Sequence, residues 1–268
     1  MSDPVVLCET DRRGVATVTL NRPEVNNAYN AEVVQALLDI FPALADDRAV
    51  RVIVIRGRGR HFQAGADLKW LQEIGRMDAA ANLATSRKTA AAMRGLNEMG
   101  KPTVALVQGA CVGGGTGIVA SCDVVIAEHT ATFAITEARW GIAATVIFPQ
   151  LNTAIGLRQV RRYALTCERF DAKRALSLGL VHELCEPGAL DATAGPVIDG
   201  LLKAAPDAVA LSKRSAMMTA GALVGEAEFT RLVSEHAAKR TTPEAAEGLQ
   251  SFIEKRDPRW YPGPASAA

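Results

Sequence analysis

The sequence of 268 residues carries 30 Lys and Arg against 29 Asp and Glu, so its formal net charge is +1. With this balance and only 5% aromatic residues, the chain has neither the positive charge nor the stacking side chains typical of nucleic-acid binding. No run approaches the ~18 apolar residues of a membrane span, and no signal-peptide pattern opens the chain. We therefore expect a cytoplasmic protein with no nucleic-acid or membrane partner.

Strand and helix patterns alternate through the first part of the chain. Apolar runs typical of strands occupy residues 15–20, 52–55, 103–107, 124–126 and 132–135. Asn30 is placed to cap a helix that begins near Val33, and residues 67–99 have helical composition. The five cysteines show no CxxC spacing, so no metal site is predicted.

After about residue 150 the helical patterns dominate. Helices are predicted over residues 171–179, 190–204, 207–220, 226–239 and 243–255. Strands alternating with helices, followed by helices alone, predict an α/β core with a helical C-terminal region. We expect the core over 1–195, the helical region over 196–260 and a loose tail over 261–268.

Glycine is concentrated in residues 109–117, GACVGGGTG, after a predicted strand. The segment has three interpretations: a turn packed closely on a helix, a dinucleotide-binding fingerprint, or an anion site. Residues 115–120 fit G-x-G-x-x-A, with Glu137 downstream, but they begin well after the strand that ends at Val107. A helix starting at Gly114 would present free N–H groups at its positive end, which suits an oxyanion.

Residues 61–70, HFQAGADLKW, form a second turn of small residues that opens a helix after a strand. Two such strand–turn–helix units can supply the two backbone donors of an oxyanion hole. The four histidines are scattered and lack a nucleophile partner, so His61, His129, His182 and His236 are expected to be structural or surface residues. Asp67 is expected to cap the helix that follows it.

In these segments the sequence resembles the crotonase superfamily, the enoyl-CoA hydratase/isomerase family. The resemblance is collinear over nearly the whole chain. It rests on residues 20–23 (LNRP), 27–28 (NA), 64–68 (AGADL), 101–102 (KP), 109–115 (GACVGGG), 122–123 (CD), 133–137 (FAITE), 179–181 (GLV) and 252–256 (FIEKR). It implies a crotonase (ClpP-like) spiral of ββα units, with a C-terminal region that builds homotrimers or dimers of trimers.

The resemblance also implies a site for acyl-CoA thioesters, with CoA as part of the substrate and no separate cofactor. The N–H groups of Ala66 and Gly114 would hold the thioester oxygen as it becomes an enolate. The residues that the resemblance assigns to substrate and CoA binding are Ala64, Gly65, Ala66, Asp67, Leu68, Gly113, Gly114, Gly117, Phe252 and Lys255. The last two would reach the CoA of a neighbouring subunit.

Hydratases of this family usually carry two glutamates, of which only one is matched here. Glu137 matches the second, whereas Gly117 stands where the first belongs. Desolvation in an apolar pocket would raise the pKa of Glu137 and suit it to acid–base work. We expect Gly117 to free volume beside the acyl chain, which suits a 3-substituted acyl group.

Three functions follow from this pattern. Residues 137–187 are most similar to hydratases of branched glutaconyl-CoA thioesters, such as 3-methylglutaconyl-CoA and the isohexenylglutaconyl-CoA of terpene catabolism. A lone glutamate also resembles the Δ3,Δ2-enoyl-CoA isomerases, in which one carboxylate moves a proton between C2 and C4. A CoA-binding pseudoenzyme is the third alternative. The sequence favours the branched-chain hydratase.

Overall fold

The computed structural model describes residues 3–261, and its main sheet has six strands in the order β1-β2-β3-β4-β6-β9. These strands are β1 (Val6–Thr10), β2 (Val15–Leu20), β3 (Val52–Gly57), β4 (Thr103–Val107), β6 (Val124–Glu128) and β9 (Glu183–Cys185). β1 pairs antiparallel with β2, and every later pair is parallel. Parallel neighbours need crossover helices, which cover both faces of the sheet.

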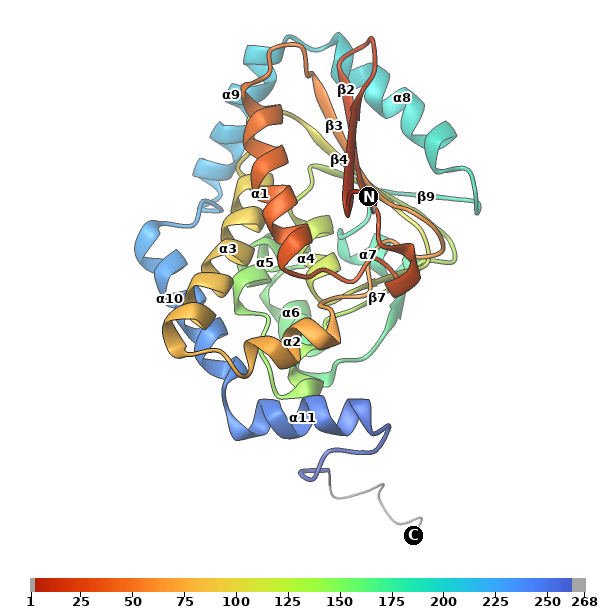
Figure 1. Cartoon of the computed structure of the whole chain (residues 1–268). Coiled ribbons are helices and arrows are strands. Elements are labelled where there is room, and N and C mark those ends of the chain that lie inside the picture. The colour runs from red at the N-terminus through yellow and green to blue at the C-terminus, as the bar shows by residue number, and fades with distance from the viewer. Residues whose placement is uncertain (1–2, 262–268) are drawn as a thin grey trace.

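Side chains of the central strands alternate between two apolar layers. In β3, Val52 and Val54 pack under α8 (Leu190–Lys203), whereas Ile53 and Ile55 pack in the main core on the opposite face. This is the period-two pattern of a strand buried on both sides. α1 (Ala31–Asp46) and α8 accordingly lie on opposite sides of the strands (Figure 1).

A second, smaller sheet lies beside the main one, in the order β5-β7-β8. Its strands are β5 (Ala110–Val112), β7 (Thr132–Ala134) and β8 (Phe170–Asp171). Each of the pairs β4/β5 and β6/β7 gives one strand to each sheet and is followed by a helix, which is the spiral of ββα units expected of a crotonase. A single bridge from Gln63 to Cys111 adds the turn around residue 63 to the edge of this sheet.

The remaining helices surround the sheets and form the C-terminal region. They are α2 (Leu68–Ile74), α3 (Ala79–Asn97), α4 (Gly114–Ala120), α5 (Phe148–Ile155), α6 (Leu157–Thr166), α7 (Ala172–Leu178), α9 (Pro206–Thr219), α10 (Glu226–Arg240) and α11 (Pro243–Ile253). α10 packs along α3, and α11 lies at the end of the molecule away from the main sheet (Figure 1). Within residues 3–261 none of the helices is both long and apolar enough to cross a bilayer.

Local sequence signals placed most elements correctly. Asn30 caps α1 by accepting from the Val33 N–H, and Asp171 caps α7. The helix predicted over 67–99 is wrong as one element, because α2 ends at Gly75 and Asp78 begins α3 as its N-cap. The boundary predicted at residue 195 falls inside α8. Apart from Tyr261, the predicted loose tail lies outside the described residues.

Candidate active site

A cavity of about 550 Å³ lies between the two small-residue turns and the C-terminal helices. Its lining joins segments that are far apart in the chain. They are the turn before α2, the start of α4, the inner faces of α1 and α3, the segment 136–147, and the ends of α10 and α11. The walls are mostly apolar, which is typical of a small-molecule site with a few polar groups.

Two backbone N–H groups in this lining have no hydrogen-bond partner within residues 3–261. Ala66 follows Gly65, whose φ of 91° favours glycine, and Gly114 follows Gly113, whose φ is 55°. The neighbouring N–H groups are used: that of Asp67 bonds to the Tyr29 carbonyl and that of Gly113 to a strand carbonyl. Among residues 3–261 the N–H groups of Ala66 and Gly114 donate no hydrogen bond. They can therefore serve an oxygen of a ligand.

Gly113 and Gly114 of the second turn lie in close contact with two side chains. A Cβ on Gly114 would lie 2.6 Å from Cε1 of Tyr29, and one on Gly113 would lie 2.9 Å from Oε1 of Glu137. Both contacts are too short for a carbon atom in place. The absence of side chains lets the Tyr29 ring and the Glu137 carboxylate approach the backbone donors closely.

Glu137 is the first residue of a short 3₁₀ helix, Glu137–Trp140, and lines the cavity. Its Oε2 atom is buried and has no hydrogen-bond partner within residues 3–261. Burial raises the pKa of Glu137 to about 7, against smaller opposing effects of backbone N–H groups and of the charge on Arg240. Such a carboxyl group can both accept and return a proton near neutral pH.

The predicted CoA-binding turn lies along the same cavity. Ala64, Gly65, Asp67 and Leu68 all contribute to its lining. Asp67 also caps α2 through the Lys69 N–H and forms a 2.9 Å ion pair with Arg22. Its carboxylate is thus engaged in holding the turn, as expected for a capping residue.

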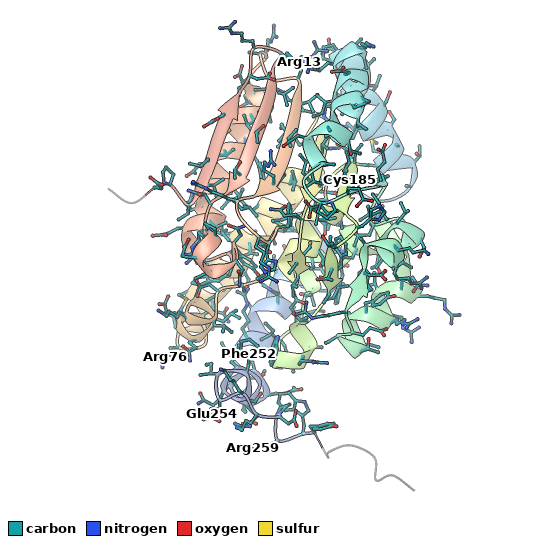
Figure 2. The ribbon with its side chains drawn as sticks, turned by 90° about the vertical axis from the view of Figure 1, so that its right-hand side faces the viewer. Arg13, Arg76, Cys185, Phe252, Glu254 and Arg259 are labelled. Carbon is teal, nitrogen blue, oxygen red and sulfur yellow. The ribbon has the colours of Figure 1, made fainter. Side chains whose placement is uncertain are left out.

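Phe252 and Lys255, the two C-terminal residues assigned to CoA, lie in different surroundings within their own chain. The ring of Phe252 meets the ring of Trp140 edge-on, with centroids 4.2 Å apart. Phe252 lines the cavity of its own chain, on the side of α11 that faces the molecule (Figure 2). Leu249 is buried beside Leu71, whereas Lys255 is exposed and does not line the cavity of its own chain. The predicted contact of Phe252 and Lys255 with the CoA of a neighbouring subunit stays a prediction.

The end of the cavity near α3 and α10 carries polar side chains that sequence reasoning missed. His236, expected to be structural, lines the cavity together with Arg240, and both are almost completely buried. Nδ1 of His236 lies 3.1 Å from the Ser86 hydroxyl, to which Arg240 donates at 3.4 Å. The spacing of His236 and Arg240, one turn apart on one helix, was the available signal.

The other three histidines lie outside this cavity and form no catalytic or metal site within residues 3–261. His61 and His182 each accept a hydrogen bond from a backbone N–H, and His129 lies at the surface beside Glu186. Within the described part of the chain no three His, Cys, Asp or Glu side chains gather as metal ligands.

Comparison with known proteins shows the family of this chain. Residues 10–262 match the family described as enoyl-CoA hydratase/isomerase. A crystal structure of an enoyl-CoA hydratase from Mycobacterium avium superposes with a TM-score of 0.83 at 33% identity, covering 97% of this chain and 100% of that one. The chain belongs to the enoyl-CoA hydratase/isomerase family.

Two curated relatives show the range of this family. The mevalonyl-coenzyme A hydratase of Aspergillus fumigatus is 32% identical over 92% of each chain. The trans-2-decenoyl-[acyl-carrier-protein] isomerase of Streptococcus mutans is 29% identical, over 92% of this chain and 94% of its own. Membership therefore establishes hydratase/isomerase chemistry on acyl thioesters and leaves the reaction to be assigned from the site.

This member of the enoyl-CoA hydratase/isomerase family departs from the two-glutamate pattern at Gly117. A Cβ on Gly117 would lie only 2.4 Å from Cγ2 of Ile147. The Ile147 side chain therefore fills the space, and the expectation that Gly117 frees volume beside the acyl chain is wrong. Ile147 and Ile118 line the cavity at this place, whereas Gly117 lies behind them.

Proposed function

We propose that the protein hydrates a branched 2-enoyl-CoA thioester of the glutaconyl type, such as 3-methylglutaconyl-CoA or isohexenylglutaconyl-CoA. The observation that carries the proposal is the buried, unpartnered Oε2 of Glu137 in the same cavity as the free N–H groups of Ala66 and Gly114. Asp67, the other carboxylate in this lining, is engaged by Arg22. Glu137 is thus the carboxylate available for proton transfer.

In the proposed reaction one carboxylate performs both proton transfers. Glu137 removes a proton from water as the water oxygen bonds to C3 of the enoyl group. Electron density moves through C2 to the thioester oxygen, and the N–H groups of Ala66 and Gly114 stabilise the resulting enolate. Protonated Glu137 then returns the proton to C2. A pKa of about 7 lets the same group act as base and then as acid.

Support for a branched acyl group comes from one relative and from the pocket. The Aspergillus fumigatus relative is named for mevalonyl-coenzyme A, and a mevalonyl group has a methyl branch at C3. The apolar part of the cavity lining includes Val33, Val34, Leu37, Ala92 and Met93. These side chains come from α1 and α3 and can accommodate alkyl substituents.

A Δ3,Δ2-enoyl-CoA isomerase is the second candidate. Gly117 supplies no carboxylate, and Ile147 occupies the space beside it. Glu137 alone would therefore serve the reacting carbons, and one carboxylate is sufficient to move a proton between C4 and C2. The Streptococcus mutans relative is named as an isomerase. A CoA-binding pseudoenzyme would bind acyl-CoA and show neither reaction.

We also propose that the chain assembles as a homotrimer or a dimer of trimers through its C-terminal helices. α9 has no buried residue, and two of its large apolar side chains, Leu211 and Met218, are 66% and 58% exposed. Phe252 and Ile253 on α11 are about 40% exposed as well. A helix that buries nothing in its own chain is typical of a subunit contact. Light scattering should give three or six times the chain mass, and a stable monomer at micromolar concentration would contradict the assembly.

A substrate screen tests the proposed reaction. The enzyme should hydrate 3-methylglutaconyl-CoA faster than straight-chain 2-enoyl-CoA, and products should be separated by mass and retention. Conversion of a 3-enoyl-CoA to its 2-enoyl isomer without hydration would favour the isomerase. Binding of every thioester without turnover would favour the pseudoenzyme.

A further inference from the structure

Arg240 is a buried cation in the cavity that lacks a carboxylate partner. The residue is only 4% exposed, its Nε atom has no hydrogen-bond partner, and no Asp or Glu among residues 3–261 forms an ion pair with it. The guanidinium donates a long hydrogen bond of 3.4 Å to the Ser86 hydroxyl, and its other polar neighbour is the Tyr29 hydroxyl. A buried charge without a counter-ion is strongly unfavourable unless a ligand supplies one.

The groups around Arg240 do not neutralise it. Burial and the charge of Arg240 hold the pKa of His236 well below its usual range, so the imidazole is neutral. The Tyr29 hydroxyl also faces the guanidinium, but burial raises the pKa of Tyr29, so the phenol stays protonated. The Trp70 ring lies 5.6 Å from the guanidinium carbon and adds a cation–π contact. None of these side chains carries the missing negative charge.

Glu137 is the carboxylate whose charge acts on Arg240, but the proposed reaction needs this carboxylate at the reacting carbons. The charge of Arg240 acts only as a minor influence on the pKa of Glu137, which burial dominates. Oε1 of Glu137 faces Gly113, beside the oxyanion donors, and no ion pair joins it to Arg240. The guanidinium is therefore not paired with Glu137 and can bind an anionic group of a ligand in the same cavity.

The position of Tyr29 links this cation to the reacting carbons. One edge of the Tyr29 ring lies against Gly114, and the ring packs against Trp70 with centroids 5.4 Å apart. Trp70 in turn contacts Arg240. Gly114, Tyr29 and Arg240 all line the same cavity, so the Tyr29 ring connects an oxyanion donor with the guanidinium along its wall.

We infer that Arg240, supported by Ser86 and His236, is the specificity-determining residue that binds a carboxylate at the far end of the acyl chain. The inference rests on the proposed function, which it deepens by giving the glutaconyl carboxylate a binding group. A planar guanidinium with several unused N–H donors suits a carboxylate in bidentate geometry. Alkyl acyl chains of the same length would leave the buried charge unpaired.

Binding of unreactive thioesters tests this inference separately from turnover. Calorimetry should compare glutaryl-CoA with the thioester in which its free carboxylate is converted to an amide, using wild type and Arg240→Met. The wild type should bind glutaryl-CoA at least about 30-fold more tightly, and Arg240→Met should reduce this ratio towards one. Arg231→Met, a change at an exposed arginine on the same helix, should keep the wild-type ratio.

The outcomes distinguish the inference from the proposed reaction. A wild-type ratio near one would overturn the inference even if the enzyme hydrates 2-enoyl-CoA. Selective glutaryl-CoA binding that is lost in Arg240→Met would support it even if no hydration is found. The melting temperature of Arg240→Met distinguishes a binding role of Arg240 from a structural one. Loss of the unpaired charge should leave it unchanged or raise it, and a fall with equal weakening of both ligands would count against a binding role. Arg240→Lys should retain part of the preference.

Discussion

The two ends of the cavity are built in different ways. At the proposed thioester end, the lining presents the backbone N–H groups of Ala66 and Gly114, which lie in two short turns between a strand and a helix. At the proposed acyl end stands a cluster of side chains, in which Ser86 of α3 meets His236 and Arg240 of α10, 150 or more residues later in the chain. Backbone donors provide chemistry that any thioester can use, whereas side chains provide the choice of acyl group.

If this division is correct, changes at the thioester end should reduce turnover of every substrate. Changes at the acyl end should instead alter the order of substrates. The predictions below test this difference, beginning with the largest effect.

Removing the carboxylate of Glu137 should have the largest effect. Glu137→Gln keeps the shape of the side chain and removes its ability to exchange a proton with water. Loss of an acid–base group commonly lowers rates by ~10²–10⁴-fold. We expect the upper part of this range because the other carboxylate that lines the cavity within residues 3–261, Asp67, is engaged by Arg22. Steady-state kinetics with any accepted 2-enoyl-CoA measure the loss.

The control is Glu183→Gln, an exposed carboxylate of β9, which should keep wild-type kinetics. Calorimetry should show that Glu137→Gln still binds saturated acyl-CoA. Turnover within about tenfold of wild type would exclude Glu137 as the proton-transfer group.

Deleting one oxyanion donor should have the next largest effect. Ala66→Pro removes an N–H that makes no hydrogen bond within the described chain, so no internal bond is lost. The expected loss in kcat is ~10²–10³-fold for all substrates alike. Ala66→Gly retains the N–H and should be far more active than Ala66→Pro. Similar rates for the two variants would contradict the role of this donor.

The pH dependence of kcat/KM should follow the ionisation of Glu137. Hydration begins with the ionised carboxylate as base, and burial raises the pKa of Glu137 to about 7. Activity should therefore fall as pH drops below 7, by roughly tenfold for each pH unit. Initial rates between pH 5.5 and 8.5 measure this, with circular dichroism confirming that the protein stays folded. A level profile from pH 5.5 to 8.5 would be inconsistent with a pKa near 7.

The difference between the two ends also explains what the sequence could predict. The strands, the capped helices α1 and α7 and both turns depend on local signals, such as Asn30 and Asp171 as caps. Glu137 and the turn residues were identified through their resemblance to a family pattern. Such a pattern states residue types at fixed places along the chain. It therefore captures the thioester end well.

The acyl end depends on packing between distant elements, which no local pattern contains. His236 is one of four scattered histidines in the sequence, and only the packing of α10 on α3 places it beside Ser86. The same limit applies to Gly117. A glycine in the sequence suggested free volume, but Ile147, thirty positions later, fills it. The sequence shows that Gly117 lacks a side chain, but it does not show that Ile147 fills the space.

The smallest predicted effect concerns this contact. Gly117→Ala places a methyl group 2.4 Å from Cγ2 of Ile147, and we expect a loss of about 1–3 kcal/mol in the free energy of unfolding. Ile147→Ala should relieve the contact. In a double-mutant cycle by urea denaturation, the double variant should thus be more stable than the sum of the single effects. Additive effects would mean that the two residues are not in contact.

Reaction in water labelled with ¹⁸O tests the central claim, single-carboxylate hydration by Glu137, most directly. The wild type and Glu137→Gln should each be incubated with a 2-enoyl-CoA and with its 3-enoyl isomer, and the products analysed by mass spectrometry. The account predicts a 3-hydroxyacyl-CoA that carries one ¹⁸O atom, formed from the 2-enoyl-CoA by the wild type and not by Glu137→Gln. Conversion of the 3-enoyl-CoA to the 2-enoyl-CoA, with no labelled oxygen in any product, would contradict it.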